Sequence, residues 1–177
     1  MTPRKLPGLK PRDQINVPDE RQRAFVHPET LEPITFEHHY KEVEAVTISA
    51  TAPVEVIDAF DRARNAFLYS WFVYELGSLA EMQGYSTLEM ALRIRMKIRP
   101  GKKVSGLSYL LNDAIAQGIV TDSQSHFEGG IAYFISKMRN TWGHGTDNLL
   151  DPSATIQALR LSADLINQLF PPSGVRR

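Results

Sequence analysis

One short segment of this chain combines side chains that can hold a phosphate and move a proton. Arg139, Asn140 and His144 lie within six residues of one another, in the string RNTWGHG. A guanidinium binds a phosphate through two parallel charge-assisted hydrogen bonds. An imidazole titrates near neutral pH and can give or accept a proton. The residue types and their spacing therefore indicate phosphate chemistry.

The same segment also has a plain structural interpretation. It follows an amphipathic run, and either Gly143 or Gly145 can end a helix. A cation in the last turns of a helix is favoured by the helix dipole. An arginine and a histidine five positions apart also occur by chance, so the bare spacing proves little. The asparagine directly after the arginine and the glycine directly after the histidine make the string more specific.

The string RNxxxHG resembles the signature of the HEPN (higher eukaryotes and prokaryotes nucleotide-binding) superfamily of small helical domains, many of which cut RNA. The resemblance implies that Arg139 grips the scissile phosphate and that His144 shuttles a proton. Asn140 would position the phosphate, the histidine or the attacking 2′-hydroxyl. It also implies metal-independent cleavage that leaves a cyclic phosphate. Two protomers would pair so that both copies of the motif share one cleft.

Helix geometry tests this interpretation. At about 100° per residue, positions 139 and 144 lie about 140° apart around an ideal helix. One continuous helix would therefore not aim both side chains at one ligand. A helix end at Gly143 can swing His144 round, and a second subunit is another solution. Trp142, inside the motif, is interpreted as a core or dimer anchor, with base stacking as the alternative.

A basic cluster is the one concentrated charge patch in the sequence. Its members are Arg93, Arg95, Lys97, Arg99, Lys102 and Lys103. They form either a solvated helix end or an RNA backbone contact. Glu89 and Arg93 are spaced like an ordinary intrahelical ion pair, and the alternative is that they are polar neighbours of the motif.

Composition limits the other possibilities. The formal net charge is +0, so no overall field attracts nucleic acid or an anionic membrane. The chain has no cysteine, which excludes disulfides, thiol catalysis and cysteine-bound zinc. His27, His38 and His39 are expected at the surface, and we expect no metal and no cofactor. No stretch suits a signal peptide or a membrane span, so we expect a cytoplasmic protein without a membrane partner.

The elements that must position the motif are predicted to be helices. Residues 1–33 hold six of the eleven prolines, and residues 1–52 are expected to form an extended, partly β or disordered arm. A strand or hairpin is possible within residues 34–50. Apolar residues at steps of three and four then predict an all-α, up-and-down bundle over residues 53–172, with four or five helices. Residues 54–99 form either one long helix or two that divide near Gly84.

The stretch from Phe67 to Tyr74 would be apolar on nearly every face of a helix, so it must be buried in a core or a dimer interface. These features favour a HEPN-type endoribonuclease, such as a toxin or defence effector, that acts on RNA as a homodimer. A toxin would also have an antitoxin or other regulatory partner. The first alternative is a non-catalytic HEPN module that binds RNA or nucleotide or mediates dimerisation. The second is a helical interaction protein in which Arg139 and His144 are structural.

Overall fold

The protein is built from helices, as its sequence predicts. The computed structural model describes residues 9–26, 30–98, 106–122, 130–143 and 151–172, and of residues 140–143 it describes the backbone alone. The helices are α1 (Phe36–Ala45), α2 (Val54–Tyr69), α3 (Leu76–Arg95), α4 (Leu107–Ala116), α5 (Gly130–Gly143) and α6 (Pro152–Leu169). Across these ranges there is no sheet, and one isolated bridge joins Val26 to Pro33.

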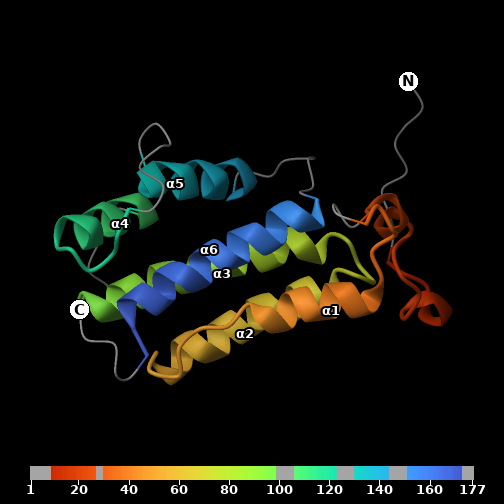
Figure 1. Cartoon of the computed structure of the whole chain (residues 1–177), viewed down its shortest axis with the longest axis horizontal. Helices are drawn as coiled ribbons and strands as arrows, with labels where there is room; N and C mark the ends of the chain where they lie inside the picture. Colours follow the sequence, from red (N-terminus) through yellow and green to blue (C-terminus); the bar gives the residue numbers. More distant parts are fainter. Residues whose placement is uncertain (1–8, 27–29, 99–105, 123–129, 144–150, 173–177) are drawn as a thin grey trace.

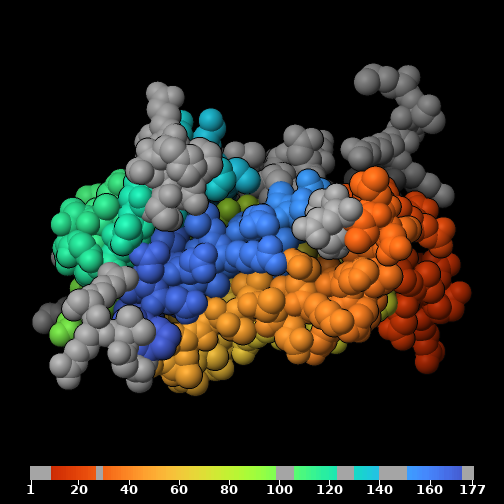
Figure 2. Space-filling view, viewed as in Figure 1, coloured from red at the N-terminus to blue at the C-terminus, as the bar shows by residue number. Residues whose placement is uncertain are grey.

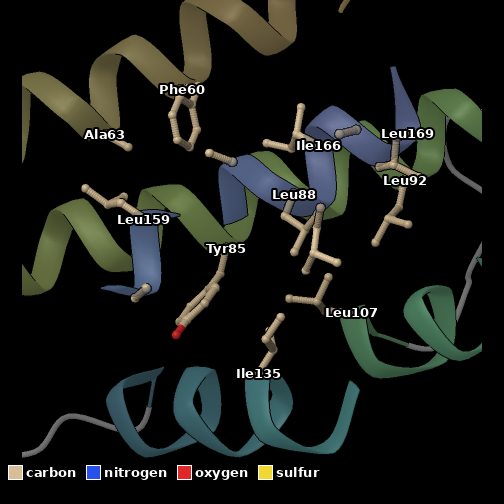
Figure 3. Close-up of a cluster of buried hydrophobic side chains, with 14 of the residues drawn as sticks. Phe60, Ala63, Tyr85, Leu88, Leu92, Leu107, Ile135, Leu159, Ile166 and Leu169 are labelled. Atoms are coloured by element: carbon tan, nitrogen blue, oxygen red, sulfur yellow. The ribbon is translucent and has the colours of Figure 1, made fainter. Parts of the chain in front are cut away.

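Helix α3 lies at the centre of the bundle. It packs against α2 and α6, and α4 and α5 form a further layer against it (Figure 1). None of the helices in the described ranges is both long enough and apolar enough to span a bilayer. The core gathers apolar side chains from all six of the helices named above, and Figure 3 shows a part of it. Examples that are at most 2% exposed are Phe60, Leu88, Leu107, Ile135 and Leu159.

The break between α2 and α3 corrects the predicted division of residues 54–99. The chain turns at Ser70–Glu75, and Gly84 lies in the middle of α3 rather than at a helix end. A Cβ atom at Gly84 would lie 2.9 Å from Leu159 Cδ2 of α6. The glycine therefore allows two helices to approach closely, and close packing against α6 offsets its low helix propensity.

Helix α1 replaces the strand or hairpin that the sequence suggested within residues 34–50. The Thr35 hydroxyl accepts a hydrogen bond from the backbone N–H of His38 at 3.3 Å, and His38 Nδ1 accepts one from the Thr35 backbone N–H at 3.5 Å, forming a capping box. His39 was expected at the surface but is only 5% exposed. Its Nε2 donates to the carbonyl oxygen of Phe67 at 2.9 Å, and its ring packs on Trp71.

The first described residues, 9–26, are fastened to the turn between α2 and α3. The Asp19 N–H donates to the carbonyl oxygen of Trp71 at 2.9 Å, and the buried Gln22 side chain donates to that of Ser70 at 3.1 Å. Arg21 pairs with Asp19 and Glu75 and lies 4.4 Å from the centre of the Tyr74 ring. We call residues 9–26 the N-terminal segment, which Figure 2 shows in red and orange at one end of the molecule.

The N-terminal segment and α1 account for the burial of the apolar run at 67–74. Trp71 is 6% exposed, and Phe36 of α1 contacts both Trp71 and Phe72. Phe25 stacks on Tyr74 with ring centroids 6.2 Å apart. Of the two alternatives for this run, the structure supports burial in a core for Phe67 and Trp71, whereas Tyr69 remains 57% exposed. A second subunit is therefore not needed to cover the buried part of the run.

Candidate functional site at the end of helix α5

Helix α5 carries the motif, and its start is fixed by a residue outside it. The Asp122 carboxylate accepts a hydrogen bond from the backbone N–H of Ile131 at 3.1 Å. Gly130 has a φ of +66°, which favours glycine, and a Cβ there would lie 2.3 Å from Asp122 Oδ2. Asp122 therefore stabilises the start of α5, although the helix itself begins at Gly130.

Two buried isoleucines set the rotation of α5. Ile131 and Ile135 are fully buried, with 0% exposure, and Ile135 points toward α3 and α4 in Figure 3. Arg139 comes one turn after Ile135 on the same face of the helix, at the point where that face leaves the core. Its side chain is 45% exposed, so the guanidinium remains accessible to a ligand.

Glu89 of α3 joins this arginine to a second one. Its Oε2 lies 3.5 Å from Arg139 Nη2, and its Oε1 accepts hydrogen bonds from Arg93 at 2.8 and 3.2 Å. The sequence alone left Glu89 and Arg93 as either an intrahelical pair or neighbours of the motif. The structure shows that they are both. We call Glu89, Arg93 and Arg139 the arginine–glutamate cluster.

The cluster has the composition of an anion-binding site. Two guanidiniums and one carboxylate leave a formal local charge of +1, from two positive charges and one negative. The Arg93 and Arg139 side chains are 33% and 45% exposed, whereas Glu89 is 18% exposed. Partly exposed ion pairs contribute little to stability. The main effect of Glu89 is therefore to orient two cations toward the same solvent-accessible region.

The remaining residues of the motif are described in part or not at all. The backbone of Asn140 and Trp142 continues α5, and the side chains of both are outside the described residues. His144 lies entirely outside them. The structure therefore places Arg139 and leaves the predicted roles of Asn140, Trp142 and His144 as predictions.

The predicted basic cluster is placed in part. Arg93 belongs to the arginine–glutamate cluster, and the exposed Arg95 and Lys97 follow at the end of α3. Neither Arg95 nor Lys97 forms an ion pair with the described part of the chain. Arg99, Lys102 and Lys103 lie outside it. Two cations without an ion pair to the described residues thus lie beyond Arg93, Arg95 in the last turn of α3 and Lys97 just after it.

One titratable residue was missed by the sequence analysis. Glu81 of α3 is 1% exposed, and neither of its carboxylate oxygens has a hydrogen-bond partner. Burial raises the pKa of this carboxyl to about 7, and the nearby Tyr85 hydroxyl offsets part of that rise. The available signal was an acidic residue between Gly77, Gly84 and Leu88, on the face of α3 that packs against other helices.

Neither a metal-binding cluster in the described ranges nor a match to a known protein helps to interpret this site. Within the described ranges, no three His, Asp or Glu side chains gather in a way that could hold a metal ion. Comparisons with protein families, with characterised proteins and with solved structures find no match for this chain. Any function must therefore be argued from the motif and the cluster around it.

Proposed function

We propose that the protein is a metal-independent endoribonuclease of HEPN type that cuts RNA through the 2′-hydroxyl. The observation that carries the proposal is the arginine–glutamate cluster, which adds a second guanidinium to the RNxxxHG motif. The helical bundle is consistent with it, because the resemblance implies such a fold. The half-exposed Arg139 is accessible to a phosphate of a polynucleotide chain.

The proposed reaction is an internal transesterification. His144, or its counterpart in a second subunit, accepts the proton of the 2′-hydroxyl or protonates the leaving group. The 2′-oxygen forms a bond to phosphorus, and the bond from phosphorus to the 5′-oxygen breaks. The 5′-oxygen receives a proton, and the other product carries a 2′,3′-cyclic phosphate. Arg139 neutralises the charge that grows on the phosphoryl oxygens, and Asn140 helps to position the reacting groups.

Arg93, Arg95 and Lys97 extend the proposed RNA contact along α3. They lie in succession from the cluster to the end of the helix, and each can neutralise a backbone phosphate. We include Arg99, Lys102 and Lys103 in the same contact because they follow directly in the sequence. Binding should therefore weaken as salt concentration rises.

A homodimer, and an antitoxin or other regulatory partner, belong to the proposal as consequences of the HEPN resemblance. With the run at 67–74 covered by the chain itself, the remaining support for a dimer is the motif. If the two copies share one cleft, a mixture of Arg139→Ala and His144→Ala proteins should regain activity in mixed dimers. Light scattering on the wild-type protein measures the state of assembly directly.

The decisive experiment compares variants on labelled RNA in the presence of a chelator. Arg139→Ala and His144→Ala should each reduce cleavage by about 10²–10⁴ without unfolding. Arg160→Ala is a matched control, because Arg160 also forms an ion pair between helices, with Glu42 of α1. The control should cut normally. Loss of activity in chelator, or equal cleavage of DNA, would contradict the 2′-hydroxyl mechanism.

The same experiment tests the alternative of a non-catalytic module. If the wild-type protein binds RNA without cutting it, and Arg139→Ala weakens that binding, the cluster is a binding site only. If neither binding nor cleavage occurs and both variants unfold, the motif is structural.

A further inference from the structure

A second polar site lies inside the bundle, away from the arginine–glutamate cluster. Gly77 of α3 faces Thr155 of α6, and Gly84 faces Leu159, so the two helices run in the same direction with little space between them. Glu81 lies between these two glycines, on the same side of α3. Its carboxylate is therefore enclosed at a seam where the backbones approach closely.

Two buried polar groups at this seam lack a well-formed hydrogen bond. Glu81 and Thr155 are each 1% exposed, and in the described part of the chain neither the Glu81 carboxylate nor the Thr155 hydroxyl has a partner at hydrogen-bonding distance and angle, although the Tyr85 hydroxyl lies near Glu81. By contrast, the buried Ser162 hydroxyl donates to the carbonyl oxygen of Ala158 at 2.9 Å. An unsatisfied buried polar group costs about 1–3 kcal/mol, so two at one seam require an explanation.

Few groups interact with Glu81 electrostatically. On its own helix the Tyr85 hydroxyl lies nearby, and from α6 the neutral Thr155 and Ser162 lie against the flanking Gly77 and Gly84. Of the cations described on α5, Arg139 pairs with Glu89 two turns further along α3, and Lys137 lies over the Tyr133 ring. No described cation therefore compensates an ionised Glu81. Burial accordingly raises its pKa to about 7 and that of Tyr85 above its ordinary range.

The C-terminal half of α5 lies over this part of α3. The two helices run in opposite directions (Figure 1), and Tyr85 points from α3 toward α5 (Figure 3). Arg139 reaches Glu89, so positions after 139 approach Tyr85 and then Glu81, at about 1.5 Å of rise per residue. The layer that covers Glu81 on this side thus includes the end of the helix that carries the motif.

We infer that Glu81, Tyr85 and Thr155 form a proton-controlled switch that sets how tightly the end of α5 is held against α3. When Glu81 is protonated it is neutral and can donate a hydrogen bond within the seam, so the end of α5 packs closely. When it loses the proton, the buried charge has the Tyr85 hydroxyl near it but no compensating cation among the described residues, and it must be hydrated. The seam with α6 is held by close backbone packing, so the layer of α5 opens instead and carries Arg139 with it.

This inference is independent of RNA cleavage, because it concerns the position of a helix. Its consequence for cleavage does rest on the proposed function. A loosened α5 would separate Arg139 from Glu89, so the proposed activity would fall as pH rises above about 7. A structural readout therefore tests the switch even if the protein does not cut RNA.

Trp142, in the last described turn of α5, provides that readout. Trp71→Phe leaves it as the only tryptophan, because the chain has two. Adding His144→Ala removes the imidazole nearest in sequence. In this background, Trp142 fluorescence should change with a midpoint near pH 7, and the further change Glu81→Gln should abolish that transition. A transition that persists in Glu81→Gln, or the lack of any transition between pH 5 and 9, overturns the inference.

Hydrogen exchange on the unaltered chain is a second test that does not require the tryptophan variant to fold. After correction for the intrinsic pH dependence, amides of residues 136–143 should be less protected at pH 8 than at pH 6. Glu81→Gln should remove this difference. Amides of α2, which lies on another side of α3, serve as the internal reference (Figure 1). Equal protection at both pH values, or a change of equal size in α2, would overturn the switch.

Discussion

At the residue scale, the half-buried carboxylate of Glu89 orients two more exposed guanidinium groups. Its two carboxylate oxygens bind arginines from two helices, and it is less exposed than either arginine. Arg139 is held at 3.5 Å, which is long for a charge-assisted hydrogen bond, whereas Arg93 is held at 2.8 Å. This difference leaves Arg139 free to exchange the carboxylate for a phosphate while Arg93 stays in place.

Substituting Glu89 should therefore separate positioning from binding. Glu89→Gln removes a negative charge beside two cations, so RNA should bind at least as tightly as before. Cleavage at saturating RNA should fall by about tenfold, which corresponds to about 1.4 kcal/mol, because Arg139 loses its orientation. Glu89→Asp should recover part of the rate.

The matched control for this substitution is Glu42→Gln, which breaks the ion pair between Glu42 and Arg160 at another helix contact. It should change neither quantity. Single-turnover rates and binding curves measure the two effects separately. Weaker binding with an unchanged single-turnover rate in Glu89→Gln would show that Glu89 does not position Arg139.

The adjacent residues His38 and His39 of α1 allow a prediction about how stability depends on pH. Burial lowers the pKa of His39, and its hydrogen bonds to the carbonyl oxygens of Phe67 and Leu68 only partly offset that effect. The unfolded chain therefore binds the proton more readily than the folded one. Stability should fall as pH decreases through about 6.5, the ordinary histidine value.

Denaturant unfolding at pH 7.5 and 5.5 measures this loss. His39→Gln should reduce the pH dependence, whereas His38→Gln, which changes the exposed neighbour, should retain it. An equal pH dependence in all three proteins would show that His39 is not responsible.

At the scale of elements, two glycines of helix α3 face α6 in different surroundings. A Cβ at Gly77 would meet its nearest neighbour, Thr155 Oγ1, at 3.6 Å, an ordinary contact. At Gly84 the nearest atom, Leu159 Cδ2, would be 2.9 Å away. Only Gly84 is therefore required by packing, although both residues are buried in the same helix.

Alanine at these two positions should have opposite effects. Gly77→Ala should be neutral or stabilise the protein by up to about 1 kcal/mol, because alanine restricts the unfolded chain. Gly84→Ala should destabilise it by about 1–3 kcal/mol, because α3 or the Leu159 side chain must shift. The free energy of unfolding from urea titrations measures both. A stabilising Gly84→Ala would mean that α3 and α6 can separate at little cost.

The sequence predicted the helices that have clear apolar stripes and missed those features that depend on tertiary contacts. The stripe at Ile156, Leu159, Ala163 and Ile166 is buried in α6, and Asp151 caps the start of that helix. Helix α1 was missed because β-branched and aromatic residues around it suggested alternation. The spacing of Phe36, His39 and Val43 on one helix face was the better signal. Pairing of Glu89 with Arg139 joins residues fifty positions apart, and no local pattern encodes it.

At the scale of the whole molecule, the N-terminal segment changes how the apolar run at 67–74 is understood. The chain itself buries Phe67 and Trp71 of this run and half-buries Phe72 and Tyr74 through α1 and residues 9–26, whereas Tyr69 stays exposed. Val43 and Val46, within the predicted arm, belong to the same buried cluster as α2 and α3. The part of the chain before residue 53 therefore contributes to the core, even though within 9–26 only Gln22 is itself buried.

Removing residues 1–26 should expose the α2–α3 turn. The deletion removes the hydrogen bonds from Asp19 and Gln22 to the backbone at Trp71 and Ser70, together with the stacking of Phe25 on Tyr74. It also removes the hydrogen bond from Lys10 to the carbonyl oxygen of Phe72 and the contacts of Arg21 with Glu75 and Tyr74. Together these losses predict a destabilisation of at least about 2–4 kcal/mol. The uncovered aromatic side chains should also bind a hydrophobic dye or bring two chains together. Denaturant unfolding, dye fluorescence and light scattering measure these effects, with deletion of residues 1–8 as the control. If the two deletions behave alike, the N-terminal segment is not required to cover the turn. Burial in a dimer interface would then be the better explanation for the apolar run at 67–74.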